Sequence, residues 1–341
     1  MKTVCLRIHD EASFAEAIDR GAKVLREGGV VAFPTETVYG LGANALDAEA
    51  VARIFTAKGR PSNNPLIVHT TSIEGARALC ATWPDSAARL AEAFWPGPLT
   101  MVLPKADCIP SIVTAGGSTV ALRIPRHPVA RALIETSQLP LAAPSANLST
   151  RISAVRADHV LRMLDGRIEM VLDGSQTPGG LESTVVDLAS ESPRLLRPGL
   201  LDAAAIEAVL GRKLVEAVEG ASPPGAAFPS PGMLKKHYAP LVPVCLVSDD
   251  GIATVQRFVA QGTRVGWMPL ESLRSTETPP IGVECIVMSN EPVRYAAHLY
   301  EALHALEIQG VDQIVIQRPP AIEAWQAVHD RLRRAAATDE E

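Results

Sequence analysis

The amino-acid sequence predicts an α/β protein of two domains, the first built on a mixed β-sheet. At 341 residues the chain is too long for one ordinary hydrophobic core. Helical patterns and short apolar strands interleave, but several strands follow one another without the long crossover of a purely parallel sheet. A stretch rich in Pro, Gly, Ala and Ser, 219–231, interrupts this pattern. We expect a first domain over 1–212, a linker over 213–240 and a second domain over 241–341.

The elements of the first domain follow from periodicity and from helix caps. Apolar residues recur on one face of a helix over 13–27, which Gly28 and Gly29 end. A buried strand over 30–33 runs into a hydroxyl- and glycine-rich loop, 34–42, and Asp47 then caps a helix that ends at Ala57. Further helices are expected at 73–80, 85–94, 128–136, 158–164 and 202–210, and strands at 66–69, 99–103, 119–124, 141–143, 168–172, 183–188 and 194–196.

The second domain resumes the same alternation and is predicted to be small and Rossmann-like. No GxGxxG motif follows its first strand, which argues against dinucleotide binding. The tail from Ala335 is expected to fray. Strands are predicted at 242–247, 264–268, 285–288 and 313–316, and helices at 251–260, 292–309 and 321–334.

Composition excludes several classes of protein. A hydrophobic content of 47% with 21% charged residues is typical of a soluble globular chain. A net charge of −6 and 4% aromatic residues argue against a protein whose main task is to coat nucleic acid. Five scattered cysteines without a CxxC pair indicate reduced thiols. With no signal-peptide core and no apolar run of about 20 residues, the protein is expected in the cytoplasm.

The most informative stretch is KGRPSNNP, residues 58–65. Lys58 and Arg60 are two cations one residue apart, placed on a loop after the predicted helix. Pro61 and Pro65 stiffen the backbone of this loop and limit the entropy lost on ordering. The planar guanidinium of an arginine, which can donate two parallel hydrogen bonds, beside the compact charge of a lysine ammonium suits a polyphosphate. The ordinary alternative is that both cations interact with the dipole of a helix end, and from these two residues alone both interpretations stand equal.

Polar residues also gather at the ends of the predicted strands, where ligands of α/β sheets bind. Each has an ordinary explanation in turn chemistry, an N-cap or a surface ion pair. The chain contains no P-loop, GxSxG or HExxH motif and no cluster with metal-ligand spacing. Without an evident nucleophile and base, the set suits catalysis by positioning and charge stabilisation. The set comprises Thr35, Thr37, Tyr39, His69, Thr119, Arg123, Ser145, Asn147 and Ser183.

Taken together, these stretches resemble the L-threonylcarbamoyladenylate synthases of the YrdC-like family, in the long form with an added C-terminal domain. The resemblance covers residues 10–240 and implies a twisted mixed sheet with flanking helices. The combination of K-x-R with S-x-N is its most specific part. The matching stretches are PTETVYGLGANA (34–45), KGRPSNNPLIVH (58–69), WPGPLT (95–100), TVALRIPRHP (119–128), APSANLS (143–149), ESTVVDL (182–188), LLRPG (195–199) and PSPGMLKKHYAP (229–240).

The resemblance implies a reaction and a set of site residues. L-Threonine, bicarbonate or CO2, and ATP give threonylcarbamoyl-AMP and pyrophosphate, and the product supplies N6-threonylcarbamoyladenosine at position 37 of tRNAs that read ANN codons. Mg²⁺ is expected on the nucleotide, and transfer machinery and tRNA are indirect partners. The implied catalytic residues are Lys58, Arg60, Ser145 and Asn147, the ATP contacts are Lys58, Arg60, Asn64, Thr119, Ser145, Ser153, Arg197 and Tyr238, and the L-threonine contacts are Thr37, His69, Arg123, Ala143 and Ser183.

Two alternatives remain open at this point. A double-stranded RNA or tRNA binder would use the same basic cleft, although net acidity and few aromatic residues argue against it. A carbamoyl-adenylate enzyme would share a similar domain, but it normally has acylphosphatase and zinc-finger modules beside it. The end of the linker, 232–239, is predicted to close over the nucleotide as a lid, with Tyr238 at the phosphates. The alternative is a linker packed on the second domain.

Overall fold

The computed structural model describes residues 2–216, 228, 230, 236–271 and 280–337, which divide between two compact units. Unit 1 comprises 1–149, 154–178 and 182–233, and unit 2 comprises 150–153, 179–181 and 234–341. The chain therefore contributes two short segments to unit 2 before it reaches the second half of the sequence. Much of the expected linker, 217–227, 229 and 231–235, lies outside the described residues, and the predicted domain boundaries stay a prediction.

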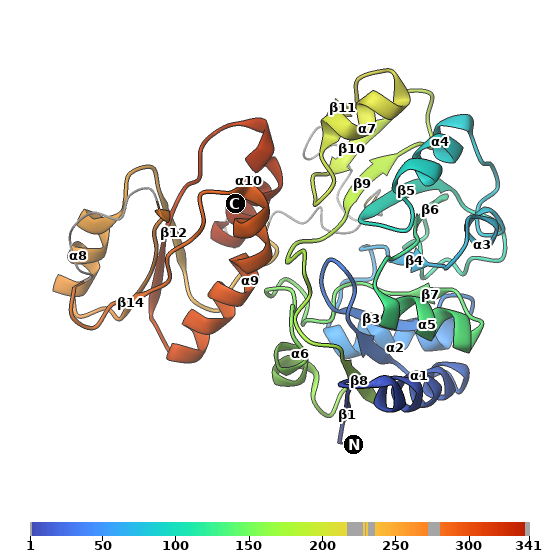
Figure 1. Cartoon of the computed structure of the whole chain (residues 1–341), viewed down its shortest axis with the longest axis horizontal. Coiled ribbons are helices and arrows are strands. Elements are labelled where there is room, and N and C mark those ends of the chain that lie inside the picture. Colours follow the sequence, from blue (N-terminus) through green and yellow to red (C-terminus); the bar gives the residue numbers. More distant parts are fainter. Residues whose placement is uncertain (1, 217–227, 229, 231–235, 272–279, 338–341) are drawn as a thin grey trace. The chain divides into compact units, whose positions relative to one another are not determined.

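Unit 1 is an α/β unit with one large mixed sheet (Figure 1). Its strands run in the order β1-β8-β2-β3-β7-β4-β6-β5-β9-β10-β11. The strands are β1 (Val4–Arg7), β2 (Val31–Phe33), β3 (Gly40–Asn44), β4 (Ile67–His69), β5 (Leu99–Pro104), β6 (Thr119–Arg123), β7 (Leu141–Ala142), β8 (Met170–Asp173), β9 (Thr184–Asp187), β10 (Arg194–Arg197) and β11 (Val215–Glu216), and the helices are α1 (Glu11–Arg26), α2 (Ala48–Lys58), α3 (Ile73–Arg77), α4 (Asp85–Phe94), α5 (Pro128–Ser137), α6 (Ala157–Leu164) and α7 (Ala203–Leu210).

Two apolar clusters hold the helices of unit 1 to the sheet. Helices α1 and α5 pack together and bury Ile18, Leu25 and Leu133 against strand residues that include Phe33 and Leu172. A second and larger cluster combines buried residues of α2, α4, α6 and α7 with further strand residues. The clusters use different residues of β2: Val31 and Phe33 join the first, and Ala32 joins the second. Because side chains alternate along a strand, helices cover both faces there.

The sequence patterns found most of these elements and missed some for clear reasons. Val4–Arg7 was not predicted as a strand, although β1 pairs in parallel with β8. The loop prediction over 34–42 was wrong at its end, because β3 begins at Gly40 and pairs with β2. The helix expected over 73–80 ends at Arg77. Lys58 does not lie on a loop: it is the last residue of α2, and Gly59 ends the helix in the left-handed conformation.

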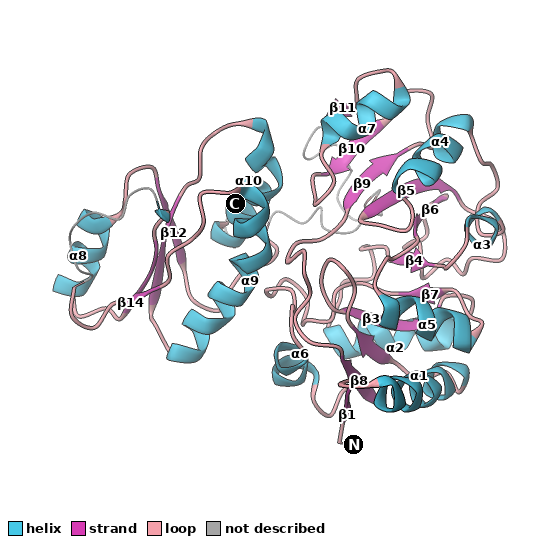
Figure 2. Ribbon diagram, viewed as in Figure 1, coloured by secondary structure: helices cyan, strands magenta, loops and turns pink. Residues whose placement is uncertain are grey.

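Unit 2 contains a four-stranded parallel sheet in the order β12-β15-β13-β14. Figure 2 draws its strands in magenta and labels β12 and β14. The predicted strand over 285–288 was misplaced, since β14 covers only Glu284–Cys285. The more specific Rossmann-like description stays a prediction. The strands are β12 (Val244–Val247), β13 (Val265–Met268), β14 (Glu284–Cys285) and β15 (Gln313–Gln317), and the helices are α8 (Ile252–Ala260), α9 (Pro292–Gln309), α10 (Gln326–Ala336) and the short 3-10 helix η2 (Glu323–Trp325).

Gly180 allows an early segment of the chain to join unit 2. Its φ is 72°, and a Cβ there would lie 2.3 Å from the Ala296 carbonyl oxygen and 2.6 Å from the Ala297 Cα, both in α9. Backbone atoms of a helix cannot move aside as a flexible side chain can. Only glycine fits this position.

We predict that Gly180→Ala destabilises unit 2 by about 2–4 kcal/mol, through backbone strain and the clash with α9. Gly282→Ala is the matched control, because Gly282 also has positive φ, 84°, but a Cβ there meets no atom within 4 Å. Urea denaturation followed by the fluorescence of Trp267 and Trp325, both in unit 2, measures the difference. Equal losses in the two variants would show that contact with α9 contributes nothing.

Candidate active site

The sheet of unit 1 brings several predicted residues to one edge. Strands β4 and β6 are parallel, and His69 and Arg123 are register partners at their carboxyl ends. Strand β5 is antiparallel to β6, so its first residues, including Thr100, lie at the same edge. Strand β9 runs parallel to β5, which brings Ser183, the residue before β9, beside Thr100. These short strands begin or end at the same edge of the sheet. They therefore bring together residues up to 114 positions apart in the sequence, from His69 to Ser183.

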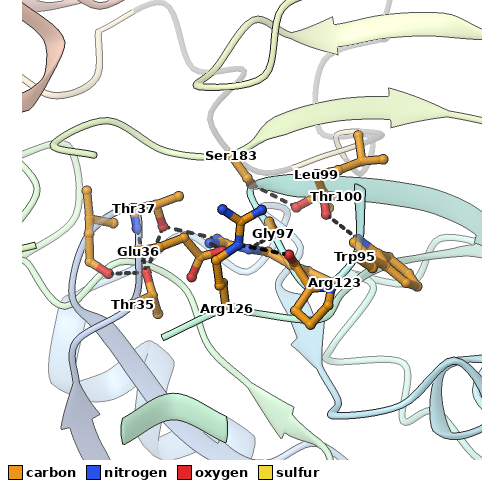
Figure 3. Close-up of polar contacts among 12 residues, drawn as sticks. Thr35, Glu36, Thr37, Trp95, Gly97, Leu99, Thr100, Arg123, Arg126 and Ser183 are labelled. Carbon is orange, nitrogen blue, oxygen red and sulfur yellow. Dashed lines mark hydrogen bonds and ion pairs between the residues drawn. The ribbon is translucent and has the colours of Figure 1, made fainter. Parts of the chain in front are cut away.

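Arg123 is the centre of this cluster (Figure 3). Its side chain is 4% exposed and contacts two different segments, 36–37 and the turn at Gly97. Nε donates to the Gly97 carbonyl at 3.2 Å, Nη1 donates to the Thr37 hydroxyl at 3.1 Å, and Nη2 lies 2.8 Å from Glu36 Oε1. The cis Trp95–Pro96 bond belongs to the turn that presents Gly97. These contacts fix the plane of the guanidinium.

Glu36 is the buried acid of this cluster, and the sequence patterns did not select it. Burial by itself raises the pKa of the Glu36 carboxyl, but the Arg123 guanidinium outweighs burial and holds the pKa below its usual value. The backbone N–H groups of Glu36 and Arg126 contribute to the lowering. The carboxyl is therefore ionised at neutral pH. These N–H groups and the Arg123 guanidinium lie near the carboxyl, but within the described chain none of them makes a hydrogen bond of full geometry to either buried oxygen.

His69 is a neutral ring in this cluster. It is 3% exposed, and burial, followed by the nearby Arg123 charge, lowers its pKa to about 3. Its Nδ1 atom is buried and has no hydrogen-bond partner among the described residues. A buried polar atom without a partner is costly unless a ligand satisfies it. His69 therefore offers one unused hydrogen-bonding position.

Ser183 is held from two sides. Its hydroxyl lies 2.8 Å from the Thr100 hydroxyl, and Arg197 donates to the Ser183 carbonyl and, at 3.1 Å, to the Ser183 hydroxyl. Gly199 packs against the same backbone: a Cβ there would lie 2.4 Å from the Ser183 carbonyl carbon. The turn after β10 thus approaches the Ser183 backbone closely and positions this residue. Arg197, which was predicted to contact ATP, is hydrogen-bonded to Ser183, which was predicted to contact L-threonine.

Lys58 forms a second cluster with the S-x-N motif. The side chain is 2% exposed, and its ammonium donates to the carbonyl oxygens of Ser145 and Asn147. Burial, with a smaller effect of Arg60, lowers the pKa of the ammonium well below its ordinary value. No carboxylate of the described chain forms an ion pair with Lys58. Lys58 is therefore a buried amine held by neutral oxygens, an arrangement that compensates a positive charge poorly.

Arg60 and Asn64 shape the loop that follows Lys58. Arg60 Nη2 donates to Asn64 Oδ1 at 2.6 Å and to the Pro65 carbonyl at 2.7 Å, and Nε donates to the Asn64 carbonyl. Asn64 is fully buried, and its Nδ2 has no hydrogen-bond partner in the described ranges. The loop is thus rigid and presents an amide donor beside two cations.

The remaining predicted residues divide between the two units. Thr119 and Arg123 lie at opposite ends of β6, on one face because they are four residues apart. Ala143 donates its amide to the Ile67 carbonyl, which leaves only its carbonyl oxygen for a ligand. Ser153 belongs to unit 2, where its carbonyl lies 3.1 Å from His304 Nε2.

Tyr238 also belongs to unit 2. Its ring stacks on Tyr300 at 5.9 Å, and the Arg331 guanidinium lies over it at 4.9 Å. Of the expected lid, residues 232–235 lie outside the described chain. The nucleotide contacts expected of Ser153 and Tyr238 stay predictions.

Two functional candidates were missed at the sequence level, Glu36 and Thr100. Glu36 stands inside the PTETVYG stretch, where hydroxyl residues drew the interpretation and the acid between them did not. The signal was present, because an acid in an apolar and hydroxyl-rich loop needs a cation, and Arg123 was already a candidate. Thr100 offers no comparable signal, since it is one hydroxyl at the start of an apolar strand.

Comparisons with known proteins show the family of this chain. A family model described as telomere recombination, the Sua5/YciO/YrdC model, matches residues 23–199, and a model described as threonylcarbamoyl-AMP synthase, C-terminal domain, matches 201–337. The threonylcarbamoyl-AMP synthase of Pyrococcus abyssi is 43% identical over 92% of both chains. The chain belongs to the threonylcarbamoyl-AMP synthase family.

Other members of the threonylcarbamoyl-AMP synthase family support the assignment along nearly the whole chain. The Bacillus subtilis protein of that name is 45% identical over 94% of this chain and 92% of the relative. A crystal structure of P. abyssi Sua5 complexed with L-threonine has a TM-score of 0.89, 40% identity and 98% coverage of both chains. The predicted mixed α/β fold is therefore confirmed. Nothing in these comparisons supports the alternative of an RNA-binding module.

We predict that the His69 ring of the folded protein stays neutral from pH 8 to pH 5. An ordinary histidine titrates near 6.5, whereas burial beside Arg123 lowers the His69 pKa to about 3. Because the unfolded chain binds this proton first, His69 reduces stability progressively as pH falls from about 6.5 towards 3. NMR titration of the His69 ring, assigned with His69→Gln, measures the pKa. A midpoint near 6.5 would contradict the described burial.

Proposed function

We propose that this chain makes L-threonylcarbamoyl-AMP and pyrophosphate from L-threonine, bicarbonate and ATP, and so acts as a nucleotidyltransferase. The observation that carries the proposal is the buried Lys58 ammonium, which carbonyl oxygens hold and no carboxylate of the described chain neutralises. A site built in this way is completed by an anion from a ligand. The relatives named above are threonylcarbamoyl-AMP synthases, one of them crystallised with L-threonine.

The ATP phosphates are assigned to the Lys58 cluster. Lys58 supplies a point charge, Arg60 a fork and Asn64 an amide donor, and the S-x-N segment holds Lys58 in place. A phosphate oxygen beside Lys58 would restore the ammonium pKa that burial lowers. We assign Ser145, Asn147, Thr119 and Arg197 to the same nucleotide.

L-Threonine is assigned to the Arg123 cluster. The guanidinium of Arg123 suits the carboxylate, and the unused Nδ1 of His69 suits a hydroxyl or another polar group of the substrate. Thr37 and Ser183 add hydroxyls, and Ala143 adds a backbone carbonyl. All five residues belong to unit 1.

The chemistry needs charge stabilisation and exclusion of water more than a nucleophilic side chain. The threonine ammonium and bicarbonate give the carbamate, water and one proton, through formation of an N–C bond and loss of a C–O bond. A carbamate oxygen then attacks the α-phosphorus, and the bond to pyrophosphate breaks. The carbamate is unstable in water, so a dry pocket protects it. Cations beside the phosphates neutralise the charge that develops on pyrophosphate.

Mg²⁺ is assigned to the nucleotide. Within the described ranges, no group of three or more His, Cys, Asp or Glu side chains is placed to hold a metal ion. The triphosphate would therefore supply most of the ligands, as is usual for Mg²⁺. The product would pass to transfer machinery that modifies adenosine 37 of tRNAs reading ANN codons, in the cytoplasm. None of the described helices is long and apolar enough to cross a membrane.

Pyrophosphate release tests the proposal directly. The purified full chain should release pyrophosphate from ATP only when both L-threonine and bicarbonate are present. An RNA-binding module would release none, and a carbamoyl-adenylate enzyme would require carbamoyl phosphate in place of threonine. Release that is independent of threonine would end the proposal.

We predict that Lys58→Met reduces threonine-dependent pyrophosphate release by about 100-fold or more, because charge-assisted contacts to the transferring phosphates are lost. Methionine keeps the length and the apolar stem, so it fills the buried space that alanine would leave. Lys23→Met is the control, because Lys23 is an exposed lysine of α1. Near-normal release by a folded Lys58→Met variant would return Lys58 to a structural role at the helix end.

We predict that L-valine fails as a substrate and that L-serine is only moderately poorer than L-threonine. Loss of the hydroxyl leaves buried polar groups such as His69 Nδ1 without a partner, which costs up to ~10⁴-fold in kcat/KM. Loss of one methyl costs about 10–200-fold. Steady-state assays of the three amino acids compare these values. Equal turnover of valine and threonine would show that the cluster does not recognise the hydroxyl.

A further inference from the structure

The Arg123 cluster contains one more charge than a carboxylate receptor requires. Glu36 Oε1 lies 2.8 Å from Arg123 Nη2, and the two side chains are 12% and 4% exposed. The pair is therefore neutral as a whole before any ligand binds. A receptor for a carboxylate alone would gain more from an unpaired guanidinium, because a buried acid beside it cancels much of the attraction. Binding of a carboxylate therefore does not explain why Glu36 lies beside Arg123.

The Glu36 carboxylate also has capacity that the protein leaves unused. An ionised carboxylate accepts about four hydrogen bonds. Both Glu36 oxygens are buried. One forms the ion pair with Arg123, and the backbone N–H groups of Glu36 and Arg126 approach the carboxyl, but none of these contacts has the geometry of a full hydrogen bond. Buried acceptors without donors are costly and are rare in folded proteins. The missing group is a donor that can approach beside Arg123.

We propose that Glu36 and Arg123 together form a receptor for an amino-acid zwitterion, in which Glu36 binds the ammonium while Arg123 binds the carboxylate. An α-amino acid carries its two charges on adjacent carbons, roughly 3 Å apart, and the receptor pair has a similar spacing. The four charges then alternate in sign, so each is stabilised by two neighbours of opposite charge. Three ammonium N–H groups would satisfy the unused Glu36 oxygens.

This inference rests on the proposed function and adds a specificity. The pair would admit α-amino acids and reject hydroxy acids or simple carboxylic acids of the same shape. Glu36 would also orient the nitrogen that is to form the carbamate. The rival interpretation is that Glu36 only holds the Arg123 guanidinium in its plane, a role that two oxygens of the protein, the Gly97 carbonyl and the Thr37 hydroxyl, already perform.

The test compares two ligands that differ only in the ammonium, L-threonine and (R)-3-hydroxybutanoate. Their dissociation constants are measured by calorimetry on the full chain for the wild type, Glu36→Gln and Glu169→Gln. Glutamine keeps the size of Glu36 and removes its charge. Glu169 is the matched control, because it forms an ion pair with Arg53 in the same unit, outside the Arg123 cluster.

If the pair is a zwitterion receptor, Glu36→Gln should raise the dissociation constant of L-threonine about tenfold or more, which is the value of one charge-assisted hydrogen bond. The affinity for (R)-3-hydroxybutanoate should change less than about threefold. The ratio of the two affinities, which measures the preference for threonine, should therefore fall by most of the tenfold loss. Glu169→Gln should alter neither ligand. If Glu36→Gln weakens both ligands equally, Glu36 acts only through Arg123 and the inference is wrong. It is also wrong if threonine affinity is unchanged.

Two further outcomes keep the inference separate from the proposed function and from folding defects. If wild-type protein binds no L-threonine and releases no pyrophosphate with it, the proposed function fails first. If Glu36→Gln does not fold, Glu36→Asp is used for the same comparison. Aspartate keeps the negative charge, but its side chain is one methylene shorter, so the carboxylate lies farther from the ligand. The preference for threonine should then fall at least about threefold with the hydroxy acid unaffected. An unchanged preference in a folded Glu36→Asp variant, or a uniform loss, would overturn the receptor.

Discussion

The desolvation of the Lys58 ammonium is the constraint on which the arrangement of α2 and the S-x-N segment depends. An amine can be removed from water at low cost only if it loses its proton or receives equivalent partners. Here it receives two carbonyl oxygens, from Ser145 and Asn147. The segment that supplies them is tied back to the helix end, because the Ser149 N–H donates to the Lys58 carbonyl. Helix α2 and the S-x-N segment are thus joined around one buried ammonium.

The second buried cation follows a different logic. Arg123 is paired with Glu36 and donates hydrogen bonds to the neighbouring Thr37 hydroxyl and to the Gly97 carbonyl of a second segment, so its charge is compensated in the free protein. Lys58 would gain most from a multiply charged anion, whereas the Arg123 pair suits a ligand that brings both signs. Under the function proposed above, this difference in local charge assigns the nucleotide to Lys58 and the amino acid to Arg123. Of the two buried cations, only Arg123 has an acid beside it among the described residues.

Sequence patterns located most of the elements and several polar residues of the two clusters. Strand ends and caps located α2, β4, β6 and their polar neighbours, because local periodicity and capping act over a few residues. Burial of Lys58 and the pairing of Glu36 with Arg123 could not be read in that way. Both depend on contacts between residues 87 positions apart, Lys58 with Ser145 and Glu36 with Arg123. Short sequence patterns do not show such contacts. Strand β1 was missed because a four-residue strand contains too few alternations to recognise.

The charge states of the cluster also constrain how catalysis can occur. Formation of the carbamate from the threonine ammonium and bicarbonate releases one proton, yet Glu36 and His69 both have lowered pKa values. Neither group is a strong proton acceptor at neutral pH. What these residues supply is fixed charge and fixed geometry, with water largely excluded. In the proposed reaction, the acceleration would therefore come from holding the amine, the carbon and the α-phosphorus in reach of one another, while Lys58 and Arg60 stabilise the departing pyrophosphate.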